Sequence, residues 1–350
     1  MWYGPAVQAG KRHEPSYMRE MYPMKIGRQR QVLTADAIFD LVRDDLHNVE
    51  KAIDIESYAS VDTVSPISKY LQQNSGERLR AALLLLCARL AGGSGNRMAI
   101  QLGAVVEMLQ AASLVHSEVV DVDQACCERP SPGLQSCVLA GDWLYLRAFR
   151  VALQERVLDL AIDAAQRMVM GELIQINRIG SVAVTEADYI ELVDCKTARL
   201  FSLCGKLGAT AAGSDKRDGE RLAEFAWNLG MAFQLIDDML DFTSCEQTLG
   251  KPVGGDLKEG KITLPLVYAL EAATAAERSL VENVLEARSY AAVPFADILA
   301  LVERHSGIQR TRERAQQFTS HARQIVSEFP GNPYQRALFT LTDLVTARDR

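Results

Sequence analysis

Three aspartates within one short segment are the residues in this sequence best suited to chemistry. On a helix, Asp237 and Asp241 share one face and Asp238 lies beside them. The neighbours Leu235-Ile236 and Met239-Leu240 are apolar, so the helix is otherwise typical of a core, where three like charges are destabilising unless a cation offsets them. Mg²⁺ prefers carboxylate and water oxygens and commonly bridges to phosphate. The segment therefore predicts a magnesium site, and the alternative is a solvated acidic face.

The residues that follow this segment supply groups suited to binding an anion. The stretch 249–265 contains several glycines, which allow close approach of the backbone to a ligand, together with Lys251 and Lys261. Lys196 and Thr197 lie upstream of the aspartates. Carboxylates, Mg²⁺, lysines and a diphosphate would together form a charge-balanced site.

The elements that must position these residues are predicted to be helices. From Thr34 onward, apolar residues recur at steps of three and four, and no sustained strand-like alternation occurs. Thr185 and Asp188 have the spacing of a capping box that opens a helix. The pattern predicts about ten helices in one all-α domain over residues 31–350, preceded by a flexible N-terminal arm over residues 1–30.

Composition and charge exclude several classes of protein. Of the 350 residues, 48% are hydrophobic and 24% are charged, which is the balance of a soluble globular chain. The net charge is −7, which argues against a nucleic-acid partner. The longest apolar run, Ala81–Ala88, is too short for an integral membrane segment, and no secretory signal is present. The seven scattered cysteines favour reduced thiols, so we expect a cytoplasmic protein.

The order of the motifs resembles that of one enzyme family, the trans-isoprenyl diphosphate synthases or polyprenyl synthetases. The resemblance runs from about Ser65 to Leu270. It rests on Gly-x-x-Phe-Gln-x-x-Asp-Asp-x-x-Asp at 230–241, Leu-Gly-Lys-Pro-x-Gly-x-Asp-Leu at 249–257, Gly-Lys-x-Thr-Leu-Pro at 260–265, Gly-Asp-Trp-Leu at 141–144 and Gly-Glu at 171–172.

This resemblance implies a helical bundle around a central cavity, usually a homodimer, that condenses an allylic prenyl diphosphate with isopentenyl diphosphate. It implies that the metal is Mg²⁺ and that its ligands include Asp237, Asp238 and Asp241. It also implies that the allylic diphosphate is held by Lys196, Lys251 and Lys261. The oxygen dipoles of Thr197 and Gln234 would stabilise the carbocation that forms when diphosphate leaves.

The chain departs from the family pattern at the first Asp-rich motif. Where the family has His-Asp-Asp-x-x-Asp, this chain has a serine at 117, and only Glu118 and Asp121 remain as carboxylates for metal. The loop that follows has Cys126-Cys127 in place of two arginines, and a thiol cannot make the bidentate phosphate contact of arginine. Arg129 lies nearby and is the residue expected to substitute in part.

The site implied for isopentenyl diphosphate is also altered. The family pattern Gly-Lys-Arg-x-Arg-Pro becomes a sequence with Glu77 in place of lysine, although Arg78 and Arg80 remain. Gln110 stands where many members have histidine. A like-charge contact at 4 Å is unfavourable by ~1 kcal/mol in water and by ~4 kcal/mol at an intermediate dielectric. We therefore expect weakened binding of the second substrate.

Three functions are compatible with this uneven pattern. The first is a prenyltransferase with a non-standard first motif, and the small residues Ala112 and Ser113 before that motif would then favour a long product. The second is a non-catalytic or regulatory subunit of a heteromeric synthase that pairs with an intact homologue. The third is a cyclase or hydrolase that acts on a prenyl diphosphate alone, without isopentenyl diphosphate.

Overall fold

Helices account for all the regular secondary structure among the described residues. The computed structural model describes residues 34–57, 78–93, 96–124, 134–244 and 253–347. These contain fifteen α-helices and one π-helix and no strand, which confirms the predicted all-α class. The number exceeds the predicted ten because short elements such as α1 (Ala35–Asp40) and α12 (Gly255–Lys258) lack a long apolar period. The predicted arm, residues 1–30, lies outside the described residues.

The first half of the described chain consists mainly of long helices packed along one another. Helix α5 contacts α2, α4, α6 and α7 of this half, and it also contacts the helix Arg199–Ala212 of the second half. Every residue from Ala81 to Ala88 of α4 is buried, as expected for a helix that is apolar on all sides. The bounds are α2 (Arg43–Ser57), α4 (Leu79–Leu90), α5 (Arg97–Gln124), α6 (Leu134–Gln154) and α7 (Leu158–Arg178).

The second half begins with the elements that carry the predicted site. Helix α8 starts at the predicted capping box, because Thr185 and Asp188 bond to each other's backbone N–H groups. Asp215 caps the start of α10 in a similar way, after Gly213 ends α9 with a positive φ of 68°. The elements are α8 (Glu186–Val193), the π-helix η3 (Asp194–Ala198), α9 (Arg199–Ala212) and α10 (Lys216–Thr243).

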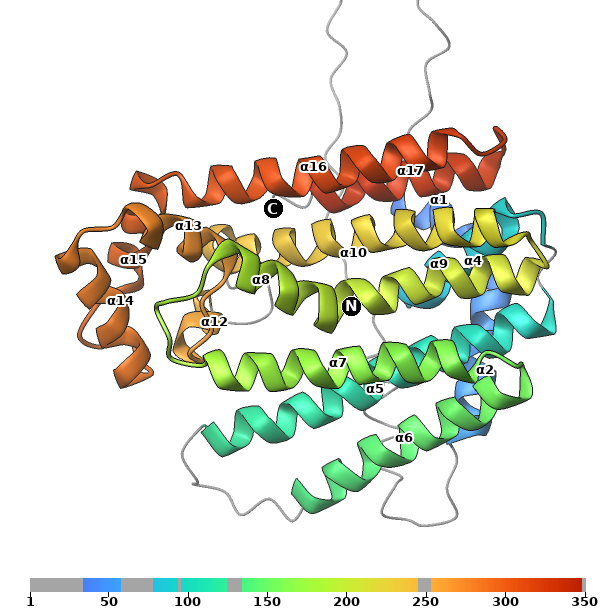
Figure 1. Ribbon diagram of the computed structural model, residues 1–350, viewed down its shortest axis with the longest axis horizontal. Coiled ribbons are helices and arrows are strands. Elements are labelled where there is room, and N and C mark those ends of the chain that lie inside the picture. The colour runs from blue at the N-terminus through green and yellow to red at the C-terminus, as the bar shows by residue number, and fades with distance from the viewer. Residues whose placement is uncertain (1–33, 58–77, 94–95, 125–133, 245–252, 348–350) are drawn as a thin grey trace, which may run out of the picture. The chain divides into compact units, whose positions relative to one another are not determined.

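The C-terminal helices cover one side of α10. In Figure 1, α16 and α17 lie above α10, while α13, α14 and α15 gather at one end of the long helices. The contacts of α16 with α10 and α17 agree with this view. These elements are α13 (Leu264–Ala272), α14 (Ala275–Ala287), α15 (Phe295–Arg304), α16 (Gly307–Ser327) and α17 (Pro333–Thr346).

One described helix segment passes a length and hydropathy test for a membrane span. It is Arg97–Ser117 of α5, and 72% of its most apolar stretch is buried inside the protein. Burial of this kind is expected of a core helix, since its apolar surface is covered by α2, α4, α6 and α7.

Candidate functional site

The three aspartates of α10 lie in different environments. Asp237 is exposed, whereas Asp238 and Asp241 are 7% and 1% exposed. Burial, together with the negative charges of Asp256 and Asp237, raises the pKa of the Asp238 carboxyl above its ordinary value. A cation bound beside this cluster would oppose that shift.

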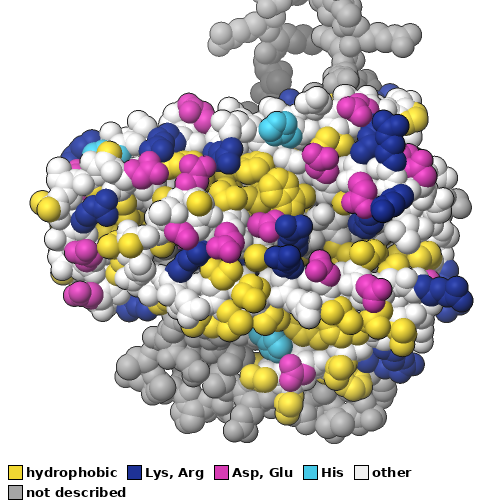
Figure 2. Space-filling view, viewed as in Figure 1, with side chains coloured by type: hydrophobic (Ala, Val, Ile, Leu, Met, Phe, Trp, Pro, Cys, Tyr) yellow, Lys and Arg dark blue, Asp and Glu magenta, His cyan; other side chains and the backbone are white. Residues whose placement is uncertain are grey.

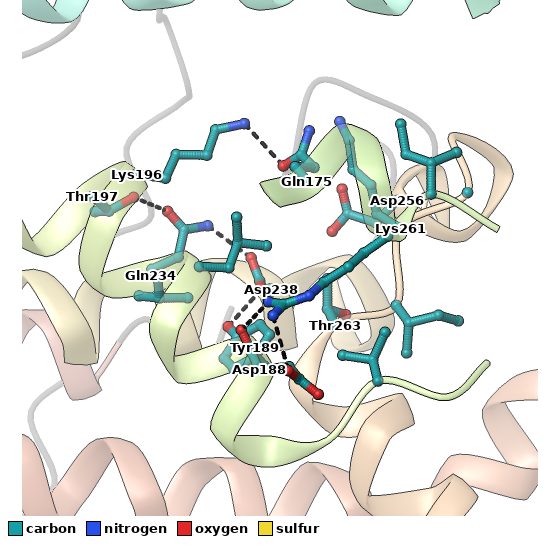
Figure 3. Close-up of a pocket in the computed structure, with 17 residues that line it drawn as sticks. Gln175, Asp188, Tyr189, Lys196, Thr197, Gln234, Asp238, Asp256, Lys261 and Thr263 are labelled. Atoms are coloured by element: carbon teal, nitrogen blue, oxygen red, sulfur yellow. Dashed lines mark hydrogen bonds and ion pairs between the residues drawn. The ribbon is translucent and has the colours of Figure 1, made fainter. Parts of the chain in front are cut away.

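A chain of hydrogen bonds joins Asp238 to the residues predicted to face the reacting carbon. The Thr197 hydroxyl donates to Gln234 Oε1 at 2.8 Å, and Gln234 Nε2 donates to Asp238 Oδ1 at 2.7 Å. Tyr189 donates to the other oxygen, Asp238 Oδ2, at 2.6 Å. Figure 3 shows this chain across three elements, α8, η3 and α10. The Gln234 amide is thereby held in one orientation. Because the Thr197 hydroxyl proton is bonded to Gln234 Oε1, the lone pairs of the Thr197 oxygen are left to face another group.

Tyr189 is suited to its place at the end of this chain. The side chain is buried, and a buried phenol needs a hydrogen-bond partner. Burial and the neighbouring charge of Asp238 raise the pKa of the Tyr189 phenol well above its ordinary value. The phenol therefore remains a donor at neutral pH.

Two glycines allow the π-helix that carries Lys196 and Thr197 to lie close to its neighbours. A Cβ atom on Gly171 of α7 would lie 2.9 Å from the backbone nitrogen of Lys196. On the other side, a Cβ atom on Gly230 of α10 would lie 3.0 Å from the backbone Cα atom of Ala198, the last residue of η3. Short π-helical segments often occur at functional sites. Here the segment η3 is positioned between α7 and α10 by backbone contacts that only glycine permits.

Lys196 points from η3 toward α7. Its Nζ donates to Glu172 Oε2 and to Gln175 Oε1, both at 3.0 Å. Glu172 also accepts a hydrogen bond of 2.6 Å from the hydroxyl of Ser117 at the far end of α5. The carboxylate of Glu172 thus connects the predicted diphosphate-binding lysine to the altered first motif.

A cavity of about 150 Å³ opens beside these residues. Lys196, Thr197, Gln234 and Asp238 line it together with Lys261, which comes from the loop after α12. In Figure 3 the side chains of Lys196 and Lys261 extend to the same side of the pocket. Lys261 also pairs with Glu259 at 2.6 Å. The structure therefore brings together two of the three predicted diphosphate-binding lysines, and the third, Lys251, lies outside the described residues.

The remaining carboxylate, Asp241, organises the backbone next to this cavity. It accepts hydrogen bonds of 3.2 Å from the backbone N–H groups of Gly255 and Asp256 at the start of α12. Gly254, which precedes this helix, has a positive φ of 69° that glycine adopts without strain. Asp241 is thus tied to the glycine-containing segment that the sequence predicted to approach the ligand.

The arginines expected to bind the second substrate lie at the start of α4, near a buried carboxylate. Glu107 of α5 is 8% exposed and accepts a hydrogen bond of 2.9 Å from the backbone N–H of Ala81. Its other oxygen lies 3.6 Å from Arg78 Nη1. Burial lowers the pKa of the Arg80 guanidinium, and the charge of Glu107 opposes that shift. Gln110 is half-buried and follows Glu107 by one helical turn.

The predicted ligands of the first motif are described only in part. Glu118 and Asp121 belong to α5, but their side chains lie outside the described part of the structure. Arg129 also lies outside it. Within the described residues, no three His, Cys, Asp or Glu side chains are grouped so as to hold a metal.

Comparison with known proteins establishes the family. The family model for polyprenyl synthetases matches residues 61–301. The chain belongs to the polyprenyl synthetase family. This membership confirms the class of enzyme predicted from the motifs, a prenyltransferase.

Individual members of the polyprenyl synthetase family match nearly the whole chain. An octaprenyl diphosphate synthase of Haemophilus influenzae is 30% identical over 329 residues, 92% of this chain and 99% of that protein. An all-trans-nonaprenyl-diphosphate synthase of Rhodobacter capsulatus is 32% identical over 314 residues, 88% of this chain and 96% of that protein. A crystal structure of a Caulobacter crescentus polyprenyl synthase, complexed with calcium and isoprenyl diphosphate, aligns with a TM-score of 0.82 and 29% identity. It covers 91% of this chain and 99% of the other.

Three residues of this polyprenyl synthetase contribute to the site without having been assigned a role from sequence. Tyr189 and Glu107 were not identified at all, and Glu172 was noted only as part of the Gly-Glu motif. A weak indication was present for Tyr189, which lies in the helix that the capping box at Thr185 opens, shortly before Lys196. No sequence pattern indicated Glu107, because its partners Arg78 and Ala81 lie at the start of another helix.

Proposed function

We propose that this chain condenses isopentenyl diphosphate with an allylic prenyl diphosphate in an Mg²⁺-dependent reaction and so makes a longer polyprenyl diphosphate. The observation that carries the proposal is the chain of hydrogen bonds from Thr197 through Gln234 to Asp238, beside Lys196 and a cavity. Members of the family named as octaprenyl and nonaprenyl diphosphate synthases support it.

The carboxylates of the site have the donor chemistry that Mg²⁺ requires. Asp237 is exposed and so is accessible to a hydrated ion, with Asp238 and Asp241 behind it on the same helix. Glu118 and Asp121 would contribute from the first motif. When bound, Mg²⁺ supplies the positive charge that makes diphosphate a better leaving group. The calcium in the Caulobacter crescentus complex supports a divalent cation in this family.

The chain's own residues would perform the remaining tasks. Lys196, Lys251 and Lys261 would bind the allylic diphosphate and remain with it as the carbon–oxygen bond breaks. Thr197 and Gln234 would present oxygen atoms to the carbocation, in an orientation that Asp238 fixes through Gln234. Groups that are oriented before the reaction need no reorganisation when charge develops. The alkene of isopentenyl diphosphate would then attack the cation, and transfer of a proton from the resulting carbocation to the departed diphosphate would complete the condensation.

The second substrate would bind at the start of α4. Arg78 and Arg80 supply two cations there, Gln110 supplies an amide, and Arg129 would contribute from the loop that lost two arginines. Arg80 Nε is buried and has no hydrogen-bond partner among the described residues, so it retains one donor for a ligand. The negative charge of Glu77 is expected to weaken this binding but not to abolish it.

The exposed surface of α6 and α7 supports a homodimer. Leu139, Leu146 and Leu153 follow one another at seven-residue intervals on α6 and are 68%, 62% and 61% exposed. Figure 2 shows hydrophobic side chains along the part of the surface that contains α7 and α6. Such a surface suits an identical or related subunit. The exposed apolar residues on α7 are Val169, Met170, Leu173 and Ile176.

We propose a long product and a cytoplasmic site of synthesis. Ala112 and Ser113 are small and buried on α5, one turn before the altered motif, and by resemblance to the family small residues at these positions favour a long chain. The names of the octaprenyl and nonaprenyl relatives support a long product.

A product assay tests the proposal. The purified chain is incubated with Mg²⁺ and farnesyl or geranylgeranyl diphosphate, with and without isopentenyl diphosphate, and the products are analysed by mass. We expect longer diphosphates only when both substrates are present. Diphosphate release from the allylic substrate alone would favour a cyclase or hydrolase. No reaction in either tube would favour a non-catalytic subunit that acts with an intact homologue.

A further inference from the structure

Glu172 occupies a position between the two halves of the site. Its Oε1 atom accepts a hydrogen bond of 2.6 Å from Ser117 on α5, and its Oε2 atom accepts one of 3.0 Å from Lys196 on η3. The side chain is 13% exposed, so little water reaches it. Each carboxylate oxygen can accept two bonds, which leaves one acceptor position on each atom for a further ligand.

A diphosphate that binds at Lys196 would compete with Glu172 for the ammonium group. A lysine that turns toward a diphosphate leaves the largely buried carboxylate of Glu172 without its cation, beside a new and larger negative charge. Gln175, the other partner of Lys196, is neutral and cannot offset it. Like charges at such a distance repel strongly where water is scarce. A cation that accompanies the diphosphate would remove the conflict.

We infer that Glu172 is a ligand for a divalent cation that enters with the allylic diphosphate, and that Ser117 is the positioning residue that holds it toward the end of α5. Lys196 is then the partner of Glu172 in the empty site, and the cation replaces it in the loaded site. The carboxylate supplied by α7 thereby lies next to Ser117, at the position where α5 has a hydroxyl in place of a carboxylate. The inference rests on the proposed function, because it requires that an allylic diphosphate binds at Lys196.

Metal counting with Mn²⁺ tests this directly. The full chain is titrated with Mn²⁺ and a thiolo analogue of farnesyl diphosphate, which resists ionisation, and bound Mn²⁺ is measured by electron paramagnetic resonance. We expect Glu172→Gln to bind one Mn²⁺ fewer per site, or to bind it roughly 10- to 100-fold more weakly. The matched control is Gln175→Met, which removes the other partner of Lys196 and should keep the full Mn²⁺ count.

A second variant guards against a change that merely disturbs the fold. In Ser117→Asp/Glu172→Gln, a carboxylate at position 117 would lie close to the place that the Glu172 carboxylate occupies now, so the lost Mn²⁺ should return. Unchanged Mn²⁺ binding in Glu172→Gln would overturn the inference, as would equal losses in Glu172→Gln and Gln175→Met. Absence of both Mn²⁺ and analogue binding in the unaltered chain would overturn the proposed function together with the inference.

Discussion

The two halves of the site use their polar side chains in opposite ways. Around η3 and α10, the predicted catalytic groups bond to one another, since Thr197, Gln234 and Asp238 form a continuous chain that ends at Tyr189. At the start of α4, the arginine expected to bind the second substrate faces a carboxylate of α5 that competes with a ligand. Arg78 lies near Glu107.

The two halves therefore differ in whether their side chains are already oriented or must first change partners. The first arrangement needs no reorientation when charge develops, which is where an enzyme gains most from fixed dipoles. The second must give up or share existing partners before a substrate or cation binds. Chemistry is therefore expected to depend on the η3 and α10 half, and affinity for the second substrate on the α4 and α5 half.

The largest effect is expected from Asp237→Asn. Loss of the accessible charge on α10 should lower kcat/KM by about 10²–10³-fold for elongation, because charge stabilisation at the leaving group is lost. Diphosphate release in the presence of both substrates should fall equally, as measured by a phosphate-coupled assay. An effect confined to isopentenyl diphosphate would contradict the division between the halves.

A smaller effect is expected from Tyr189→Phe. This change removes one hydrogen bond to a carboxylate, a contact of about 1.5–3 kcal/mol, so kcat should fall roughly 10- to 100-fold. The KM values for both substrates should change little, because Tyr189 acts through Asp238 and Gln234. Steady-state kinetics separates the two parameters, and a changed KM with a constant kcat would place Tyr189 in binding.

The reverse pattern is expected from Glu77→Lys. A change of two charge units near the second substrate should lower the KM for isopentenyl diphosphate by at least about tenfold, since each close charge contact is ~1 kcal/mol even in water. The KM for the allylic diphosphate should stay constant. Glu77→Gln, which changes one unit, should give about half the effect on a logarithmic scale.

The smallest effect is expected outside both halves of the site, on the pH dependence of the protein's stability. Hydrogen bonds from the backbone and hydroxyl of Thr274, and from His305 and Arg304, lower the pKa of Glu277 to about 2. Its stabilising contribution is therefore complete above the unfolded value of about 4.3 and is lost as the pH falls through about 2. Melting curves at pH 2–6 should show a shallower pH dependence for Glu277→Gln. Identical profiles would contradict the assignment.

The amino-acid sequence by itself determined the helical class, the capping box at Thr185 and the order of the family motifs along the chain. The first two depend on neighbours within one or two turns, and the apolar period and cap spacing are both local quantities. The family motifs are also patterns along the chain, and the match over residues 61–301 confirmed the family that they indicated. The roles of the individual site residues stay predictions.

Only the tertiary structure decided which partner each charged group has. Glu172 lies 55 residues from Ser117 and 24 from Lys196, and Tyr189 lies 49 from Asp238. No periodicity links such positions, because these contacts arise where α7, η3 and α10 approach at Gly171 and Gly230. Hydrogen bonds and ion pairs act over a few ångströms in space, whereas sequence patterns report only neighbours along the chain. The sequence thus determined which ionisable side chains the site contains, and helix packing determined which partner neutralises or bonds each of them.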